Sequence, residues 1–283
     1  KPYLVTRSNT DTIGNIYNLN IIVGGTENVG LLRKSDYMEG NNFSTDGIAR
    51  AKNDFLITDS HVQKIDFTND AKGGTLFRTD KFGIDLAKDN FIVTAMQNKS
   101  TNSSGKDMYN IVMLANGTTN SARTGAPANL YLNLNANDLV KVKNTKPITI
   151  GTAENTGYNM IGLMAYNGGV LENNANLTVN TKDSIGLAIE GISERVNGAG
   201  TVVEAKESSG TSTNSIIKMT GDHSIGIYNN GRTYSMNGGS VDVSGKNSVG
   251  VFASGIPTIN TVTNEIISYK KPNTTLSNAS LKV

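Results

Sequence analysis

The chain contains no cysteine and no tryptophan, and both absences limit what it can be. Without cysteine, its 283 residues can form no disulfide framework, no thiolate metal site and no cysteine nucleophile. Both cytosolic proteins and secreted proteins that must cross a periplasm can lack cysteine, so this absence leaves the compartment open. Aromatic residues are also scarce, at 6% of the chain.

The chain has almost no net charge. Lys and Arg number 26 against 24 Asp and Glu, which gives a formal charge of +2. No global field is present to attract nucleic acid or an anionic membrane, and we expect no nucleic-acid partner. Basic residues gather locally at Lys141, Lys143 and Lys146. A solvated strand face explains this cluster better than a phosphate site.

Motifs of metal, nucleotide and hydrolytic chemistry are missing. His61 and His223 are the only histidines, so with no cysteine we expect neither a transition-metal site nor a cofactor. His223, in the segment GDHS, is interpreted as a turn residue. The EF-hand calcium loop, the Walker phosphate loop and the Gly-x-Ser-x-Gly elbow are all absent.

Long apolar runs are absent too. The opening KPYLVTRSNTDTIG lacks the apolar region of a signal peptide, and no run approaches the roughly 18 apolar residues of a membrane helix. The chain also starts and stops without an obvious cap, so we expect it to be a piece of a longer protein. What the chain does have is asparagine and glycine, 37 and 30 residues. Both tolerate left-handed backbone conformations, so this composition predicts a chain that turns often.

One short phrase recurs in the second half of the chain. It places a glycine between two aliphatic residues, as in MIGLMAYNGG, SIGLAIEG, SIGIYNNG and SVGVFASG, where these glycines are Gly162, Gly186, Gly226 and Gly250. Successive glycines are 24, 40 and 24 residues apart. The long interval contains a polar, Gly- and Ser-rich stretch at about 192–214, which we interpret as an inserted loop.

Upstream, the phrase is less regular. NVGLLRKS surrounds Gly30, KFGIDLAK surrounds Gly83, and NIVMLANG has Val112 in the position of the glycine. Each period also contains a second, alternating run about ten residues before the glycine, such as NLTVN, SIIKMT and SVDVS; LYLNLN at 130–135 looks similar. Alternation over four to six residues is typical of half-buried strands.

A unit of about 24 residues with two or three short strands cannot bury its own apolar face, but stacked copies can. The predicted fold is therefore all-β, a right-handed parallel β-helix (β-solenoid) with coils of about 24 residues and loop insertions. In this register Ile225, Ile227, Val249 and Val251 point inward. The glycine between each pair points outward, or lies at a bend where a side chain would obstruct the chain.

The chain is predicted to form one continuous elongated domain with two parts. Residues 1–159 are expected to be an irregular β-helix portion with longer loops. Residues 160–283 are expected to hold the regular coils and the inserted loop at about 192–214.

The late copies of the phrase, above all GGSVDVSGKNSVGVFASG, resemble the passenger domains of the large type V autotransporter adhesins of fusobacteria. The resemblance covers 160–283 through the motif and 1–159 through composition. It implies a monomeric β-helical passenger exposed on the bacterial outer-membrane surface, attached to the membrane only through a β-barrel outside this chain. It further implies attachment to host cells or other bacteria by binding a host-cell surface protein or glycan. The shared motif is structural and transfers no functional residue.

Parallel β-helices also include carbohydrate-active enzymes such as polysaccharide lyases and tailspike-type hydrolases, which need clustered carboxylates. The spacings of the acidic residues do not match the coil period, so we interpret them as solvated surface groups and expect no enzyme; the residues concerned are Asp54, Asp59, Asp66, Asp70, Asp80, Asp85 and Asp89. A purely structural stalk remains the other alternative.

If the rod binds a ligand, loops that bulge from it are the expected sites. The inserted loop has mixed charge suited to a protein surface or a sugar, and its candidate ligand-binding residues are Glu194, Arg195, Glu204, Lys206 and Glu207. Residues 88–110 form a second candidate loop.

Overall fold

The computed structural model describes residues 4–5, 18–33, 55–80, 82–94, 97–117, 140–153, 156–191, 194–200, 202–204 and 207–283. Within these ranges all the regular elements are β-strands, and no helix is long and apolar enough to cross a membrane. The all-β prediction is therefore confirmed for the described part of the chain. The predicted strand at 130–135 lies outside it.

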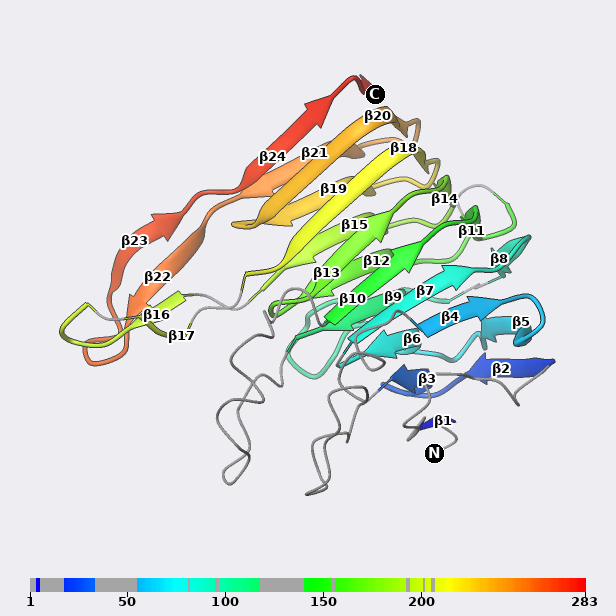
Figure 1. Ribbon diagram of the computed structural model, residues 1–283, viewed down its shortest axis with the longest axis horizontal. Coiled ribbons are helices and arrows are strands. Elements are labelled where there is room, and N and C mark those ends of the chain that lie inside the picture. The colour runs from blue at the N-terminus through cyan, green and yellow to red at the C-terminus, as the bar shows by residue number, and fades with distance from the viewer. Residues whose placement is uncertain are drawn as a thin grey trace, which may run out of the picture.

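Eight parallel strands form the first sheet, and they follow the order of the chain from one edge to the other (Figure 1). Each strand pairs with the strand before and after it in this order, as in the register Ile185↔Ile225 and Ile225↔Val249. The strands are β1 (Leu4–Val5), β3 (Val29–Arg33), β6 (Thr75–Thr79), β9 (Asn110–Asn116), β12 (Met160–Tyr166), β15 (Ile185–Glu190), β19 (Ile225–Asn230) and β21 (Val249–Ser254).

The second sheet has eleven parallel strands arranged in two columns. The long strand β18 pairs with β13 through its first half and with β14 through its second half, so it spans both columns. β20 spans them in the same way, against β24 and β25. The members are β4 (Phe55–Thr58), β7 (Phe82–Ala87), β8 (Phe91–Val93), β10 (Val140–Asn144), β11 (Ile148–Ile150), β13 (Val170–Asn173), β14 (Leu177–Val179), β18 (Ser209–Met219), β20 (Thr233–Val243), β24 (Asn273–Ser277) and β25 (Ser280–Lys282).

Two smaller sheets complete the described structure. β2 (Leu19–Val23) pairs in parallel with β5 (Val62–Phe67). The other small sheet has four strands in the order β17-β16-β22-β23, and it projects from one end of the stacked strands (Figure 1). Its strands are β16 (Glu194–Val196), β17 (Val202–Glu204), β22 (Ile256–Asn260) and β23 (Ile266–Lys270).

The parallel pairing follows from the path of the chain. From β12 the chain passes through β13 and β14 of the second sheet and returns to the first sheet as β15. Ser184, just before β15, therefore contacts Met160, the first residue of β12, after a circuit of 24 residues. The same circuit is repeated through β18, β19, β20 and β21. This arrangement is compatible with a β-solenoid, in which each repeat buries its apolar face against its neighbours.

The space between the two sheets is filled by one continuous cluster of apolar side chains. Leu163, Leu187 and Ile227 of the first sheet are fully buried, as are Leu177 and Ile217 of the second. Burying each aliphatic side chain contributes roughly 1.5–3 kcal/mol. These side chains form rows that run along the stack from one repeat to the next. The repeats therefore stabilise one another, and no single described repeat has a core of its own.

The predicted register of the phrase is wrong at its first aliphatic residue and at its glycine. Ile225 is only partly buried and Val249 is 40% exposed, whereas Gly226 and Ile227 are both buried. The inside–outside alternation therefore shifts by one residue at the glycine. A Cβ on Gly226 would lie 2.7 Å from Val241 Cγ1 of the opposite sheet and 2.6 Å from the carbonyl oxygen of Gly250. The glycine faces the core, and the part of the prediction that a side chain would obstruct the chain there is confirmed.

Of the three early copies of the phrase, two lie in the first sheet and one does not. Gly30 lies in β3 of the first sheet, and Val112 takes the glycine position in β9 between the pairs Ile111↔Ile161 and Met113↔Leu163. Gly83 belongs instead to β7 of the second sheet, where it pairs with Lys141, so the copy assigned there is wrong. The strand that takes its place in the first sheet is β6.

Candidate functional site

The four-stranded sheet, called the arm below, is built from two hairpins that leave the first sheet at equivalent points. One hairpin, β16 with β17, follows the end of β15, and the other, β22 with β23, follows the end of β21. The strands β16 and β22 pair in parallel, with Arg195 opposite Ile259. The arm therefore joins repeats that are not adjacent in the stack, since β19 lies between β15 and β21.

Both hairpins are insertions of the same size. Gly168 and Ser208, which contact each other across the first hairpin, are 40 residues apart in the sequence. Thr233 and Asn273, which pair on either side of the second hairpin, are also 40 residues apart. An uninterrupted repeat separates equivalent residues by only 24 positions. Where no hairpin is present, β19 is linked to β20 through Gly231 and Arg232 alone. Removing 192–207 or 256–271, two segments of equal length, would leave a link of the same kind.

The predicted inserted loop at about 192–214 differs from what is observed. Its described residues 194–196 and 202–204 form a hairpin, and the part from Ser209 onward belongs to the long strand β18. A polar, Gly-rich sequence can still form strands when its backbone finds partners at a sheet edge, and here β22 supplies them. The second hairpin was not predicted from the sequence.

The structure brings four of the five predicted ligand-binding residues into or beside the arm. Glu194 and Arg195 lie on β16, and Arg195 pairs across the hairpin with Glu204 of β17. Glu207 is exposed and forms an ion pair with Lys270 of β23. Lys206 lies outside the described residues. Sequence reasoning placed these residues on a loop and missed their neighbours on β22 and β23.

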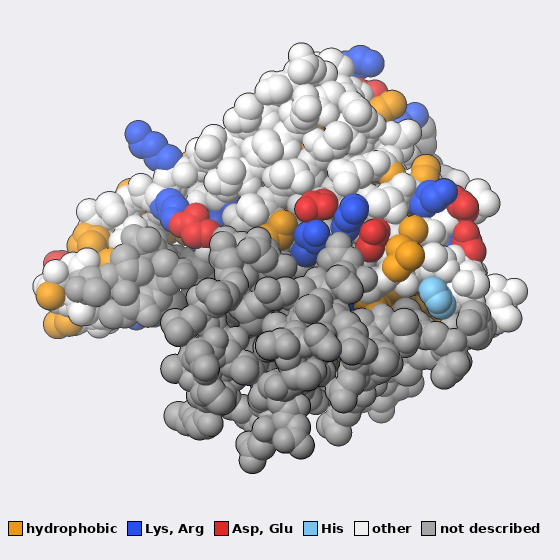
Figure 2. Space-filling view, in the orientation of Figure 1, with side chains coloured by type: hydrophobic (Ala, Val, Ile, Leu, Met, Phe, Trp, Pro, Cys, Tyr) orange, Lys and Arg blue, Asp and Glu red, His pale blue; other side chains and the backbone are white. Residues whose placement is uncertain are grey.

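The arm combines a small buried interior with an exposed apolar rim. Val196, Ile256 and Thr258 are almost completely buried. Exposed apolar side chains concentrate on β23 and the turn before it: Val262 (71% exposed), Ile266 (52%), Ile267 (53%) and Tyr269 (65%). Figure 2 shows apolar side chains at the outer end of the arm, at the left of the view. A cluster of this kind is typical of surfaces that contact another macromolecule.

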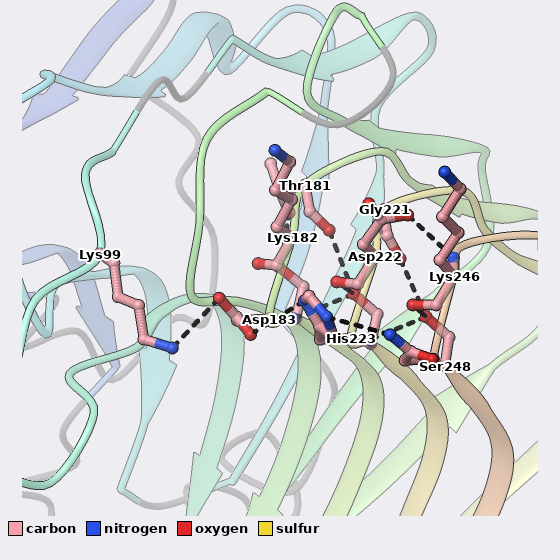
Figure 3. Close-up of polar contacts among 12 residues, drawn as sticks. Lys99, Thr181, Lys182, Asp183, Gly221, Asp222, His223, Lys246 and Ser248 are labelled. Atoms are coloured by element: carbon pink, nitrogen blue, oxygen red, sulfur yellow. Dashed lines mark hydrogen bonds and ion pairs between the residues drawn. The ribbon is translucent and has the colours of Figure 1, made fainter.

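Apart from the arm, a polar cluster lies at the turns that precede the repeated phrase (Figure 3). Asp183 and His223, at equivalent turn positions, both have positive φ angles, so the turn position predicted for His223 is confirmed. His223 Nδ1 lies 3.9 Å from Asp183 Oδ1, and Lys99 Nζ lies 3.3 Å from Asp183 Oδ2. The predicted loop 88–110 contains the strand β8 and ends at the first residue of β9, so it is only partly a loop. Lys99 lies between these two strands, and its contact with Asp183 links this segment to the turns.

Serine side chains stabilise these same turns from within. Ser224 Oγ accepts a hydrogen bond from the backbone N–H of Ser184 at 3.1 Å, and Ser248 Oγ accepts one from the N–H of Ser224 at 2.9 Å. Ser184 Oγ does the same for the N–H of Met160. This ladder of serine hydrogen bonds explains why the phrase begins with serine. It also shows that the turn cluster helps to stack the repeats.

Charged side chains elsewhere are arranged as pairs along the second sheet, where Figure 2 shows acidic and basic groups together in a band. Lys141 lies 3.6 Å from Glu172, Lys143 lies 3.7 Å from Asp85, and Lys146 lies 3.0 Å from Asp89. Lys141 and Lys143 therefore lie on a strand face, as predicted, whereas Lys146 lies in the bend between β10 and β11.

Asp54 lies outside the described residues, and the other predicted acidic residues also have partners, including Asp70, which accepts a hydrogen bond from Thr68. Asp59 bonds Lys88, Asp66 accepts hydrogen bonds from Thr94, and Asp80 bonds Arg78. The hydrogen bond from Lys88 lowers the pKa of the Asp59 carboxyl below its ordinary value. Among the described residues no three His, Asp or Glu side chains are grouped closely enough to hold a metal ion.

One carboxyl group lies where the arm joins the body. Glu190 is the last residue of β15, and its pKa is raised, because burial disfavours the charged form and outweighs the opposing effect of Arg232 and Lys106. Ser208 Oγ donates a hydrogen bond to the backbone carbonyl of Glu190 and accepts one from the backbone N–H of Gly168. Through these two hydrogen bonds, Ser208 joins the base of the first hairpin to the neighbouring repeat.

Comparison of the chain with families, curated proteins and solved structures finds no match.

Proposed function

We propose that this chain is a non-enzymatic, surface-exposed segment of a bacterial autotransporter adhesin. In this proposal the stacked repeats form a right-handed parallel β-helix whose coils have the 24-residue period seen between Met160 and Ser184 and between Ser224 and Ser248. They act as the rod that carries the arm away from the cell surface. The arm contacts a protein or a glycan on a host cell or on another bacterium.

The observation that carries the proposal is the construction of the arm. Two insertions of equal length, separated by one uninterrupted repeat, meet in one four-stranded sheet. Neither hairpin contributes a strand to the two large sheets, whose apolar rows pass from one repeat to the next without them. An addition that the core does not use, with exposed Ile and Tyr side chains on its rim, is typical of an interaction site.

Deleting both hairpins tests the proposal. The wild-type chain and a variant without residues 192–207 and 256–271 are labelled and incubated with epithelial cells and with bacterial cells, and bound protein is measured by flow cytometry. We expect the deletion to abolish binding. Treating the target cells with periodate or with protease separates a glycan from a protein receptor.

The control is a variant that changes the body of the molecule. Exchanging the charges of Lys143 and Asp85 alters the paired band and leaves the arm intact, so this variant should bind like the wild-type chain. Wild-type binding by a folded deletion variant would show that the arm is not the adhesive surface.

A further inference from the structure

The outer strand of the arm has a free edge. In the described sheet order β23 has one neighbour, β22, and it lies at the margin of the arm (Figure 1). The N–H and C=O groups along the other side of an edge strand are available to pair with a further strand.

The side chains of β23 do little to prevent such pairing. Natural edge strands are usually protected by charged residues, by proline or by a covering segment. β23 presents Ile266, Ile267 and Tyr269, each more than half exposed, and its one charged residue, Lys270, forms an ion pair with Glu207. The register shift opposite Ile267 gives β23 one extra residue, which twists the edge locally and shortens the stretch able to pair.

We propose that β23 pairs with β23 of a second copy of this chain. A closed dimer in which the same edge meets itself requires a two-fold axis, and two strands related by such an axis run antiparallel. With the axis at Ser268, Ile267 of one copy lies opposite Tyr269 of the other. Aromatic and β-branched residues form favourable pairs across antiparallel strands.

Charge is the reason for choosing this register and this partner. The same axis places Glu265 of each copy opposite Lys271 of the other, so two ion pairs flank the apolar centre. Both residues are exposed, and neither has an ion-pair partner among the described residues. A strand from an unrelated protein would need a matching pattern, whereas β23 and its flanking residues carry their own complement.

The dimer goes beyond the proposed function, because it requires neither a receptor nor a cell. It also differs from the monomeric passenger expected from the sequence. A pairing restricted to one five-residue strand is smaller than the interfaces of stable complexes, so the association is weak and reversible in solution. Many copies on one surface would strengthen it through high local concentration.

Because the chain contains no cysteine, one introduced thiol reports this contact without interference. Ser268→Cys places the two sulfur atoms directly across the axis, where the Cα separation of antiparallel pairs, about 4.5–5.5 Å, suits a disulfide. Thr263→Cys is the matched control, since it is an exposed position of the preceding turn and lies away from the axis. Under mild oxidation we expect Ser268→Cys to form disulfide-linked dimer at least about tenfold faster than Thr263→Cys.

Charge exchange in the Ser268→Cys background tests the register. Lys271→Glu places two carboxylates opposite each other and should slow cross-linking by about threefold to tenfold at low salt. Adding Glu265→Lys restores the complementary charges and should restore the rate. Equal cross-linking of Ser268→Cys and Thr263→Cys, or no response to Lys271→Glu, would contradict the proposal. The first result would leave the edge available to a strand of another protein. Unchanged thermal unfolding of each variant shows that the fold is intact.

Discussion

The repeated phrase requires glycine because the opposite sheet and the next repeat both come too close to this position for a side chain. A Cβ on Gly186 would lie 2.6 Å from the carbonyl oxygen of Gly226 and 3.0 Å from a side-chain carbon of Ile217. Gly186→Ala should therefore destabilise the fold by about 1–3 kcal/mol, the usual cost of overpacking a core. Gly198→Ala in the arm is the control, because the nearest atom to its added Cβ is 3.4 Å away. Urea denaturation of both variants measures the difference, and equal midpoints would contradict the buried position of Gly186.

A buried tyrosine makes stability depend on pH at the alkaline end. Tyr234 is completely buried, and its hydroxyl donates to Ser212 Oγ at 2.8 Å. Burial raises the pKa of Tyr234 above its ordinary value of 10.0, and burial also raises the pKa of Tyr109, to about 12. Because the folded state holds these protons longer than the unfolded state, the stabilisation is complete below about pH 10 and is lost as pH rises through the folded-state pKa values. Tyr234→Phe should make the urea midpoint fall less steeply between about pH 10 and pH 12, and an identical slope would contradict the prediction.

At the level of elements, the strands of the first sheet are aligned by the serines that precede them. Ser224 Oγ accepts from Ser184 N–H and donates to the carbonyl oxygen of Thr181 at 3.2 Å. Ser224→Ala leaves both buried backbone groups without this partner, which should cost about 1–3 kcal/mol. Ser235→Ala, an exposed position of β20, should have almost no effect. Thermal unfolding of the two variants tests the ladder, and it would be disproved as a stabilising element if both unfolded at the same temperature.

The elements were largely predictable from the sequence, because a fixed period and short alternating runs indicate stacked parallel strands. The orientation of the phrase was not predictable, because strict alternation places Ile225 and Ile227 on one face, whereas the observed strand shifts by one residue at Gly226. Asparagine was expected at turns, and eight of the eleven described non-glycine residues with positive φ are Asn. Its use inside the structure was not foreseen: Asn144 Nδ2 donates to Asn173 Oδ1 at 3.2 Å, and both side chains are buried.

At the scale of the whole molecule, only the first of the two hairpins that form the candidate site could be located from the sequence. The first hairpin delays the next copy of the phrase from Gly186 to Gly226, and this delay located it. The second hairpin follows the last copy, at Gly250, so no later glycine could report a delay. Its sequence IPTINTVTNEIISYK also looks like ordinary strands. The meeting of the two hairpins depends on pairing between segments far apart in the sequence, as in Glu194↔Thr258, which no local pattern indicates.

The equal size of the two hairpins predicts that the stack folds without them. Deleting 192–207 and 256–271 leaves Gly191 joined to Ser208 and Gly255 joined to Pro272, each a short link like Gly231–Arg232 between β19 and β20. The strands on either side keep the register of the uninterrupted repeats and the same apolar rows. We therefore expect far-UV circular dichroism typical of β-structure and a melting temperature within about 5 °C of the wild-type value.

Deleting 209–224 instead removes a segment as long as one hairpin, but it takes out β18 and the turn after it, so that variant should fail to fold cooperatively. If both deletions unfolded the chain, the arm would belong to the folding unit and could not be an independent addition to the stack.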